Sequence, residues 1–545
     1  MANKSTSQPA ALAPHPGSQS MPRWDLGELV NPPTFKLRNW FAMLGPGLLM
    51  AGAAIGGGEW LTGPAVTARY GGGLMWLATL SILGQVFYNL EISRYTLYSG
   101  EPIFTGKFRT LPGPTFWLLI YLMLDFGSVF PYLAANAATP LAAVILGRIP
   151  DPTETWTTLT ILGETHTFTH ASLMRGLGIG IFLLSLLPLI FGGKIYNALK
   201  LIMTFKIVAV FGFLIFVAVF FSTWSTWATI LAGFFKFGTV PVGKTEVDNV
   251  FLAMWRGDGI PAVDLSMMAV LAAFAAVAGQ GGLSNTPLSN YTRDQGWGMG
   301  YHVGAIPSVF GGRNIALSHV GMVFEPSQPQ AMPRWRRWYA FLMRDQLVIW
   351  MPACFIGMAL PAMLSIQFVP RGTTGDDWTT AGMTANGLRD HVGAQPAWGP
   401  TWGEAFWYMT LVCGFLVLAP TMASTIDGIV RRWVDVFWTS SPRLRHWKPH
   451  QIRNLYFYVV AGYSVFGLTM LAFGNPMGLL KIAAKFLNFA LGFSCFHTLV
   501  INTTLLPPPL RPSWFMRVGL VLAGLFFIAI SVVSTYAALL DAGYL

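Results

Sequence analysis

The amino-acid sequence predicts an all-α polytopic membrane protein of about eleven transmembrane helices, arranged as two inverted five-helix repeats plus one extra helix. Three observations lead to this prediction. Hydrophobic residues make up 53% of the chain and charged residues only 10%, whereas a soluble domain carries about 25% charged residues. Apolar stretches long enough to cross a bilayer recur along nearly the whole sequence. Two of these stretches, five spans apart, are interrupted by runs of glycine.

The N-terminal residues differ in composition from the rest of the chain. Residues 1–39 are rich in Ser, Pro, Ala and Gln, and they do not begin with the apolar core of a signal peptide. We therefore expect a mobile cytoplasmic tail here.

The apolar stretches define the order of the helices. They are too long and too uniform for barrel strands, and backbone groups in lipid must be bonded within their own helix. The expected spans cover roughly residues 41–69, 73–98, 114–147, 174–193, 198–222, 265–294, 338–366, 402–430, 454–473, 477–505 and 514–540. Residues 40–222 then form the first repeat, 223–264 an outer loop, 265–505 the second repeat, and 506–545 the additional helix.

The basic residues between the spans predict the orientation. With a cytoplasmic N-terminus, the inner loops hold about twice as many Lys and Arg residues as the outer loops, in agreement with the positive-inside rule. This topology places the C-terminus outside a plasma or inner membrane. It also places three long connections outside, residues 148–173, 223–264 and 367–401. Because the net charge of +11 is spread between spans rather than along one face, we expect no nucleic-acid partner.

The first and sixth spans carry the unusual glycine runs. The first reads Ala-Ala-Ile-Gly-Gly-Gly-Glu-Trp over residues 53–60, and the sixth reads Gly-Gln-Gly-Gly-Leu-Ser-Asn over residues 279–285. Each glycine lowers helix propensity by about 1 kcal/mol relative to alanine, so both spans are expected to unwind. Unwound backbone at this depth is tolerated where it lines a cavity, and its recurrence in both repeats indicates a midplane binding site. The alternative is that the glycines only allow close helix packing.

Both breaks therefore supply candidate substrate-binding residues. They are Gly56, Gly57, Gly58, Glu59, Gly281, Gly282, Ser284 and Asn285. Bare carbonyl groups bind hard cations, whereas the N-terminus of the following half-helix favours an anionic group. Glu59 and Asn285 are the candidate metal ligands.

Ionisable residues within the spans are functional candidates because a charge in the membrane is costly. Glu59 either coordinates a cation or carries a proton, since burial favours the neutral carboxyl group; the alternative is a structural ion pair. Asp125 and His497 are the other proton-coupling candidates, although His497 is equally consistent with a core residue.

Other charged residues are spaced for pairing. Arg293 and Asp294 are expected to form an inner gate pair rather than to bind a ligand. The spacings Glu91/Arg94 and Asp427/Arg431 place opposite charges on one helix face. Lys481 and Lys485 are expected to extend toward the outer surface; if they reached the cavity instead, they would replace a coupling ion with fixed charge.

Residues 45–72 resemble the first span of the natural-resistance-associated macrophage protein (Nramp) family of metal-ion transporters. The matching residues are Gly45-Pro46-Gly47, Trp60, Thr62 and Ala68-Arg69-Tyr70-Gly71. Asp125 and Asn285 are compatible with the family's third and sixth spans. The resemblance extends over spans one to ten. It implies the LeuT-type fold and proton-linked transport of divalent metals such as manganese or iron.

The functional motifs of that family are replaced in this chain. Where the family has Asp-Pro-Gly-Asn, the chain has Gly56-Gly57-Gly58-Glu59, and where it has Met-Pro-His-Asn, the chain has Gly282-Leu283-Ser284-Asn285. Only Asn285 carries over unchanged. Loss of the soft methionine ligand removes a preference for transition metals. The chain therefore looks like a divergent Nramp-related branch.

No catalytic set accompanies these features. The sequence contains neither a phosphate-cradling glycine loop nor a His–Glu metalloprotease helix, and its glycine runs do not follow a strand. We expect no enzyme activity and no cofactor.

We expect a secondary transporter coupled to an ion, with a proton favoured over sodium, that carries a divalent metal cation. The alternatives are the same fold carrying an amino acid or other small organic solute, and a membrane enzyme or sensor that has borrowed the fold. Substrate identity, direction and oligomeric state stay open.

Overall fold

Long apolar helices dominate the computed structural model, which describes residues 13–33, 46–161, 164–191, 195–306 and 317–544. Within these residues, nine helical segments are long and apolar enough to cross a membrane. They are Pro114–Leu146, His170–Ile190, Leu199–Phe221, Leu265–Asn285, Ala331–Phe368, Gly399–Ser440, Pro449–Phe473, Pro476–Thr504 and Trp514–Asp541. These segments correspond in order to the third to eleventh predicted spans. The predicted all-α, multi-pass membrane class is confirmed.

The start of the chain differs from the predicted count. Segments Pro46–Leu74 and Trp76–Ser99 meet the same criteria only as a pair, and the pair is bent by 96°. If the pair is one span, the described residues hold ten spans, so the predicted number of eleven is not confirmed. The first residues of the predicted span 41–69, including Gly45, lie outside the described part.

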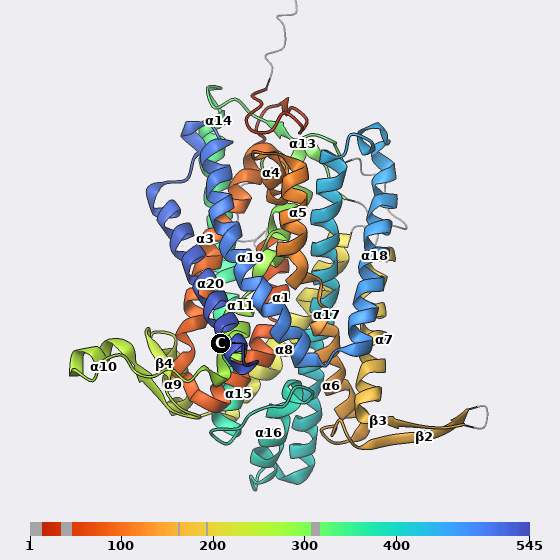
Figure 1. The fold of residues 1–545 in the computed structure, drawn as a ribbon, viewed down its shortest axis with the longest axis vertical. Coiled ribbons are helices and arrows are strands. Elements are labelled where there is room, and N and C mark those ends of the chain that lie inside the picture. Colours follow the sequence, from red (N-terminus) through yellow and green to blue (C-terminus); the bar gives the residue numbers. More distant parts are fainter. Residues whose placement is uncertain (1–12, 34–45, 162–163, 192–194, 307–316, 545) are drawn as a thin grey trace, which may run out of the picture.

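The helices run mostly along the long axis of the molecule (Figure 1). The helical elements of the first half are α1 (Pro46–Ala54), η3 (Gly58–Thr62), α2 (Gly63–Tyr70), η4 (Gly71–Leu74), α3 (Trp76–Ser99), α4 (Ile103–Arg109), α5 (Pro114–Leu124), η5 (Asp125–Val129), α6 (Tyr132–Leu146), α7 (His170–Phe191), α8 (Ile195–Phe221), α9 (Trp224–Gly233) and α10 (Val250–Arg256). Those of the second half are η6 (Leu265–Met267), α11 (Met268–Val277), η7 (Gly282–Asn285), α12 (Pro287–Asp294), α13 (Gly300–Val303), α14 (Ala331–Arg344), η8 (Asp345–Trp350), α15 (Met351–Phe368), η9 (Thr380–Gly382), α16 (Met383–Gly393), α17 (Gly399–Ser440), η10 (Leu444–His446), η11 (Pro449–Gln451), α18 (Ile452–Phe473), α19 (Pro476–Thr504), η12 (Pro508–Leu510) and α20 (Trp514–Asp541).

Short strand pairs occur in the connections. Strand β1 (Asp25–Leu26) pairs in parallel with β6 (Met322–Val323). The antiparallel pairs are β2 (Thr155–Ile161) with β3 (Glu164–Thr169), and β4 (Thr239–Pro241) with β5 (Val247–Asn249). The β2–β3 hairpin, α10 and α16 all lie in the lower half of Figure 1, away from residues 13–33 at the top. The three long connections therefore share one end of the molecule, as the predicted topology requires; which end faces the cytoplasm stays a prediction.

The described part of the predicted N-terminal tail lies against the bundle. Trp24 is 3% exposed, and its indole N–H donates to Glu101 over 3.0 Å. Glu101 also forms an ion pair with Arg109, with 2.5 Å between Oε1 and Nη2. Burial alone would raise the pKa of Glu101, but the Arg109 guanidinium and the donated hydrogen bonds outweigh burial and lower it. Residues 13–33 thus include contacts with the loop that follows α3, and the mobility of the tail stays a prediction.

Both predicted interruptions are present. Helix α1 ends at Ala54, and the chain turns at Ile55 and Gly56 before it resumes as the π-helical segment η3. Helix α11 ends at Val277, and Gly279, Gly281 and Gly282 follow with φ angles of +96°, +70° and +59°. Backbone with such positive φ is open to glycine at little cost.

The two interruptions touch each other. A Cβ atom added at Gly58 would lie 2.0 Å from the carbonyl oxygen of Val277. Since that neighbour is backbone, no side-chain rotation relieves the overlap. Glycine at this position is therefore required for the close approach of the first and sixth spans.

We expect Gly58→Ala to lower the thermal stability of the purified protein, because the added methyl group forces the two half-helices apart at a cost of about 1–3 kcal/mol. The measurement is the Tm in detergent. Gly180→Ala is the matched control, since Gly180 lies in α7 and a Cβ there meets nothing within 4 Å. The control is expected to keep or raise the Tm, because alanine favours helix. Equal Tm values for the two variants would contradict the close contact.

Candidate functional site

A single carboxylate joins the two helix breaks. Glu59 lies in the first turn of η3 and is 0% exposed. Its Oε2 accepts a hydrogen bond from the backbone N–H of Gly56 over 2.9 Å, and its Oε1 accepts one from the N–H of Gly279 over 3.1 Å. The first of these bonds satisfies a donor left unpaired where the second half-helix begins. The second extends the same carboxylate to the sixth span.

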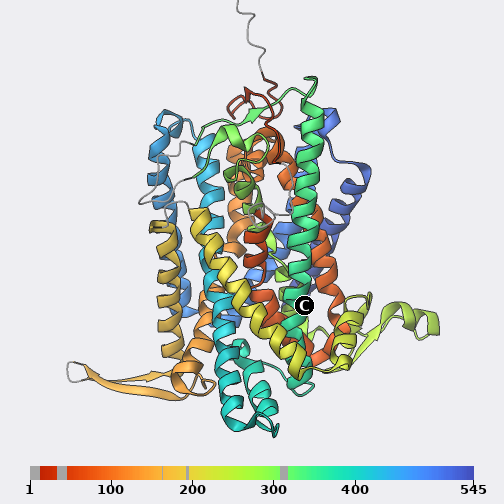
Figure 2. The same cartoon turned by 180° about the vertical axis from the view of Figure 1, so that it is seen from behind.

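A buried lysine lies at the other end of the first break. Lys206 of α8 is 0% exposed, and its Nζ donates to the carbonyl oxygen of Gly52 over 2.7 Å and to Thr421 Oγ1 over 2.5 Å. It also donates to the carbonyl oxygen of Ile55. These carbonyl groups end the first half-helix, where the helix dipole favours a cation. Figure 2 shows α8 in yellow, crossing the bundle obliquely beside α1.

Lys206 was not among the residues predicted from the sequence. The signal was nevertheless present, because Lys206 is a charged residue inside the apolar span 198–222. Its partners could not be read from the sequence, since they lie on α1 and α17.

The sixth break is held by an amide side chain. Gln85 of α3 accepts the backbone N–H groups of Gln280 and Gly281 at Oε1, over 2.9 and 3.0 Å. Its Nε2 donates to the carbonyl oxygen of Ala278 over 2.7 Å. Asn285 donates to Gln85 and to Asn89 over 3.1 and 2.9 Å. One side chain from a neighbouring helix therefore pairs three of the backbone groups that the interruption after α11 leaves without helical partners.

Two small cavities lie beside the breaks. The first, of about 20 Å³, is lined by Ala53, Ala54, Gly57, Tyr132, Leu133, Val277, Gly279, Gln280, Ser284, Thr421 and Thr425. The second, of about 10 Å³, is lined by Met50, Gln280, Ser284, Pro287, Tyr291, Ser424, Thr425, Gly428 and Arg432. The larger has room for about one water molecule, or for an ion of similar size. Of the predicted binding residues, Gly57 and Ser284 line these cavities.

The predicted metal ligands are engaged in different ways. The carboxylate of Glu59 accepts backbone N–H groups, whereas Asn285 uses its amide nitrogen and leaves Oδ1 without a hydrogen-bond partner among the described residues. Across the described ranges, no group of three or more His, Cys, Asp or Glu residues could hold a metal ion.

Asp125 is held in a buried ion pair. Its carboxylate binds Arg432 of α17, with 2.5 and 2.9 Å between the oxygen and nitrogen atoms, and accepts the indole N–H of Trp433 over 2.7 Å. Arg432 also donates to the carbonyl oxygen of Leu283 in η7, over 2.9 Å. Asp125 therefore supports the sixth break through Arg432.

Arg293 and Asp294 form the predicted ion pair, with 2.8 Å between Nη2 and Oδ1. The pair belongs to a larger buried network, since Arg293 also binds Asp435 and Asp294 also binds Arg431. Two further pairs expected from spacing are confirmed, Asp427–Arg431 at 2.6 Å and Glu91–Arg94 at 2.9 Å. The gating role of Arg293 and Asp294 stays a prediction.

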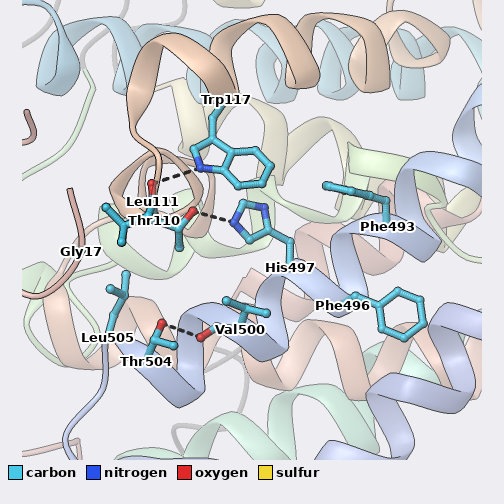
Figure 3. Close-up of a pocket in the computed structure, with 10 residues that line it drawn as sticks. All are labelled: Gly17, Thr110, Leu111, Trp117, Phe493, Phe496, His497, Val500, Thr504 and Leu505. Atoms are coloured by element: carbon cyan, nitrogen blue, oxygen red, sulfur yellow. Dashed lines mark hydrogen bonds between the residues drawn. The ribbon is translucent and has the colours of Figure 1, made fainter.

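His497 lies in a different part of the molecule from the breaks. Its ring nitrogens are hydrogen-bonded with Thr110 Oγ1 at 2.8 Å and Tyr121 Oη at 2.7 Å, and its ring centroid is 4.1 Å from that of Trp117. Figure 3 shows His497 among the residues that line a pocket. The pocket is largely apolar and has a volume of about 450 Å³. The pocket is lined by Gly17, Thr110, Leu111, Trp117, Phe493, Phe496, His497, Val500, Thr504 and Leu505, all outside the two breaks. The structure does not bring His497 together with Glu59.

Lys481 binds Asp377, with 2.6 Å between Nζ and Oδ1, and its side chain is 33% exposed. Asp377 belongs to the connection 367–401, so Lys481 extends toward that end of the molecule as expected. It does not reach the two cavities beside the breaks.

Comparison with known proteins supports the fold and leaves the family open. No family model matches the chain. Over 120 residues the chain is 34% identical to an uncharacterized protein, PM0681, of Pasteurella multocida, but the match spans only 21% of this chain and 26% of that relative.

The solved structures give a longer match. A manganese transporter of Eremococcus coleocola, in complex with an aromatic bis-isothiourea substituted compound, is similar with a TM-score of 0.56 at 12% identity, over 94% of this chain and 90% of that one. A histidine-to-alanine mutant of the transporter has a TM-score of 0.52 at 12% identity, over 95% and 90% of the two chains. The protein therefore has a LeuT-type fold.

We expect Arg432→Met to destabilise the protein strongly, since it leaves Asp125 buried without its partner at a cost of about 3–5 kcal/mol. The Tm of the purified variant measures this loss. The double variant Asp125→Asn/Arg432→Met removes both charges and is expected to recover part of the loss. A single variant as stable as the wild type would contradict a supporting role for the pair.

Proposed function

We propose that the protein is a proton-coupled secondary transporter that carries a divalent cation through a midplane site between its broken first and sixth helices. The observation that carries this proposal is the bridge from Glu59 to Gly56 and Gly279. This buried carboxylate is hydrogen-bonded to both breaks, so a charge that arrives between them changes the strength of these hydrogen bonds. Both breaks must move for cargo to pass.

Competition for Glu59 supplies the coupling. The ionised carboxylate makes strong hydrogen bonds to the two N–H groups, and protonation weakens them because charge-assisted bonds are about twice as strong as neutral ones. A proton binds these oxygen atoms directly, whereas a cargo cation in the neighbouring cavity attracts the same carboxylate, so either one weakens the bridge between the breaks. Exchange of one for the other links cargo movement to a proton gradient.

The size and chemistry of the site favour an ion as cargo. The cavity of about 20 Å³ has room for a bare ion and not for an organic molecule. Ser284 lines it, and Oδ1 of Asn285 lacks a partner within the described chain. Oxygen ligands suit hard ions such as Mg²⁺ and Mn²⁺. The similarity to a manganese transporter is consistent with this cargo.

The ammonium group of Lys206 favours a second candidate, a small organic solute. Lys206 binds the carbonyl groups of Gly52 and Ile55 at the first break, and like charges repel strongly in the protein interior. A solute without net positive charge avoids this repulsion. It requires the cavity to widen beyond its present volume.

The test is uptake of labelled Mn²⁺ or Mg²⁺ into proteoliposomes under an imposed proton gradient. We expect the wild type to accumulate the ion and Glu59→Gln to lose at least about 10-fold in rate, a loss of about 1.4 kcal/mol or more in transition-state terms. Glu164→Gln is the matched control, because Glu164 lies on the β2–β3 hairpin with its side chain 84% exposed. Gel filtration verifies that each variant is monodisperse.

Each other outcome is informative. Uptake of amino acids and not of ions by the same liposomes identifies the second candidate. Wild-type rates in Glu59→Gln would exclude Glu59 as the coupling residue. Absence of any gradient-driven uptake would contradict a transporter.

A further inference from the structure

The apolar pocket around His497 opens toward the lipid face of the bundle. Its walls come from α5, α19, the connection between α4 and α5, and the N-terminal segment at Gly17 (Figure 3). Val500 of the spanning helix α19 lines the pocket and is 48% exposed. Exposed apolar side chains of a spanning helix face the hydrocarbon of the bilayer. The pocket is therefore accessible to lipid.

The pocket continues along one face of α19. The α19 residues that line it or an adjoining pocket recur at helical spacing, and they include Phe486, Phe489, Phe493, Val500 and Thr504. This spacing places the side chains on one face of the helix. The adjoining pocket has a volume of about 330 Å³, meets the first at Phe493, and is otherwise lined by α5 and α19. We call the two pockets together the α5–α19 groove.

The part of the groove around His497 has the dimensions of a lipid chain. From Phe493 to Thr504 the helix rises by about 16 Å. One leaflet supplies about half of the ~30 Å hydrocarbon thickness, so this stretch corresponds to roughly one leaflet. The pocket volume of about 450 Å³ exceeds what a few water molecules need. Because aromatic and aliphatic side chains dominate the lining, the occupant must be apolar here.

A basic residue lies at the end of this stretch. Nε of Arg511 donates to the carbonyl oxygen of Leu506 over 3.0 Å, and Leu506 directly follows Leu505, which lines the pocket. Arg511 is exposed, so its guanidinium group is accessible to a phosphate group. Basic residues at the membrane surface attract anionic lipids.

The N-terminal segment closes the same end of the groove. The N–H of Ser18 donates to the carbonyl oxygen of Arg109 over 2.7 Å. A Cβ atom added at Gly17 would lie 2.2 Å from that oxygen and 3.2 Å from Leu505 Cδ2. An occupant of the groove therefore packs against the N-terminal segment as well as against α5 and α19.

We propose that the α5–α19 groove binds one acyl chain of an anionic phospholipid, from the leaflet on the side of residues 13–33, with the headgroup at Arg511. A lipid is favoured over a second copy of the chain because the groove combines an apolar lining along one leaflet with a basic group at its end. This combination matches the apolar chain and anionic head of one molecule.

The experiment is photo-crosslinking of the full-length protein in phosphatidylcholine nanodiscs. A small share of the lipid is phosphatidylglycerol or phosphatidylcholine that carries a diazirine on one acyl chain. We expect labelling by phosphatidylglycerol to saturate and to concentrate on Trp117 and residues 493–505. The anionic lipid should label these residues about 5-fold more than phosphatidylcholine does, as one basic residue at the membrane surface provides. Unlabelled phosphatidylglycerol should compete.

Three variants separate the groove from ordinary boundary lipid. Val500→Trp fills the groove and should abolish its labelling. Val465→Trp is the matched control on α18, where Val465 is 68% exposed and lines neither pocket, and it should leave the labelling unchanged. Arg511→Gln should keep the labelling of the groove and lose the preference for phosphatidylglycerol.

Several outcomes would overturn the proposal. They are labelling spread evenly over the groove, α18 and α20, equal labelling by the two lipids, unchanged labelling in Val500→Trp, and a groove covered by a second copy of the chain, detected as protein dimers in the nanodiscs. If Val500→Trp does not fold, the competition on the wild type and the Arg511→Gln comparison decide. No step depends on transport, so the result is independent of the proposed function.

Discussion

The structure depends on how it satisfies the backbone groups that two helix breaks expose inside a membrane. Burying an unpaired N–H or C=O group at this depth costs roughly several kcal/mol of free energy. Glu59 accepts N–H groups from both breaks, and Gln85 both accepts and donates at the sixth. Lys206 donates to the carbonyl groups that end the first half-helix. Three side chains thus replace the missing helical hydrogen bonds, and two of them carry opposite charges.

The same constraint explains the glycine at position 58. The breaks can share one carboxylate only if their backbones are nearly in contact, and the carbonyl group of Val277 leaves no room for a Cβ atom at Gly58. Gly58 therefore brings Gly279 within reach of Glu59. The charged residues around α17 serve the same arrangement, because Arg432 links Asp125 to the carbonyl group of Leu283 beside the sixth break.

The sequence predicted features that depend on neighbours along the chain. Glycine runs locate the breaks, and the spacing of Asp427 from Arg431 predicts a pair on one helix face, which the structure confirms. Features that depend on packing between distant helices were not predictable in this way. Gln85 looks ordinary until α3 is placed against the sixth break, and the partners of Lys206 are known only once α8 is placed against the first. His497 lies on a span as apolar as the others, yet it faces Thr110 and Tyr121 rather than Glu59.

Charge balance at the first break relates the charge of the cargo to the proton exchange proposed for its transport. Glu59 and Lys206, both fully buried, sum to no net charge when both are ionised. A divalent cation adds two positive charges to this neutral pair, and burying uncompensated charge in the interior is costly. For the proposed metal cargo, the cost falls if Glu59 first carries a proton and releases it as the cation enters, because the net charge of the site then rises by one and not by two. A solute without net charge requires no such exchange. In the proposed transport cycle, the number of protons exchanged therefore depends on the charge of the cargo, because ionised Glu59 and Lys206 already balance each other.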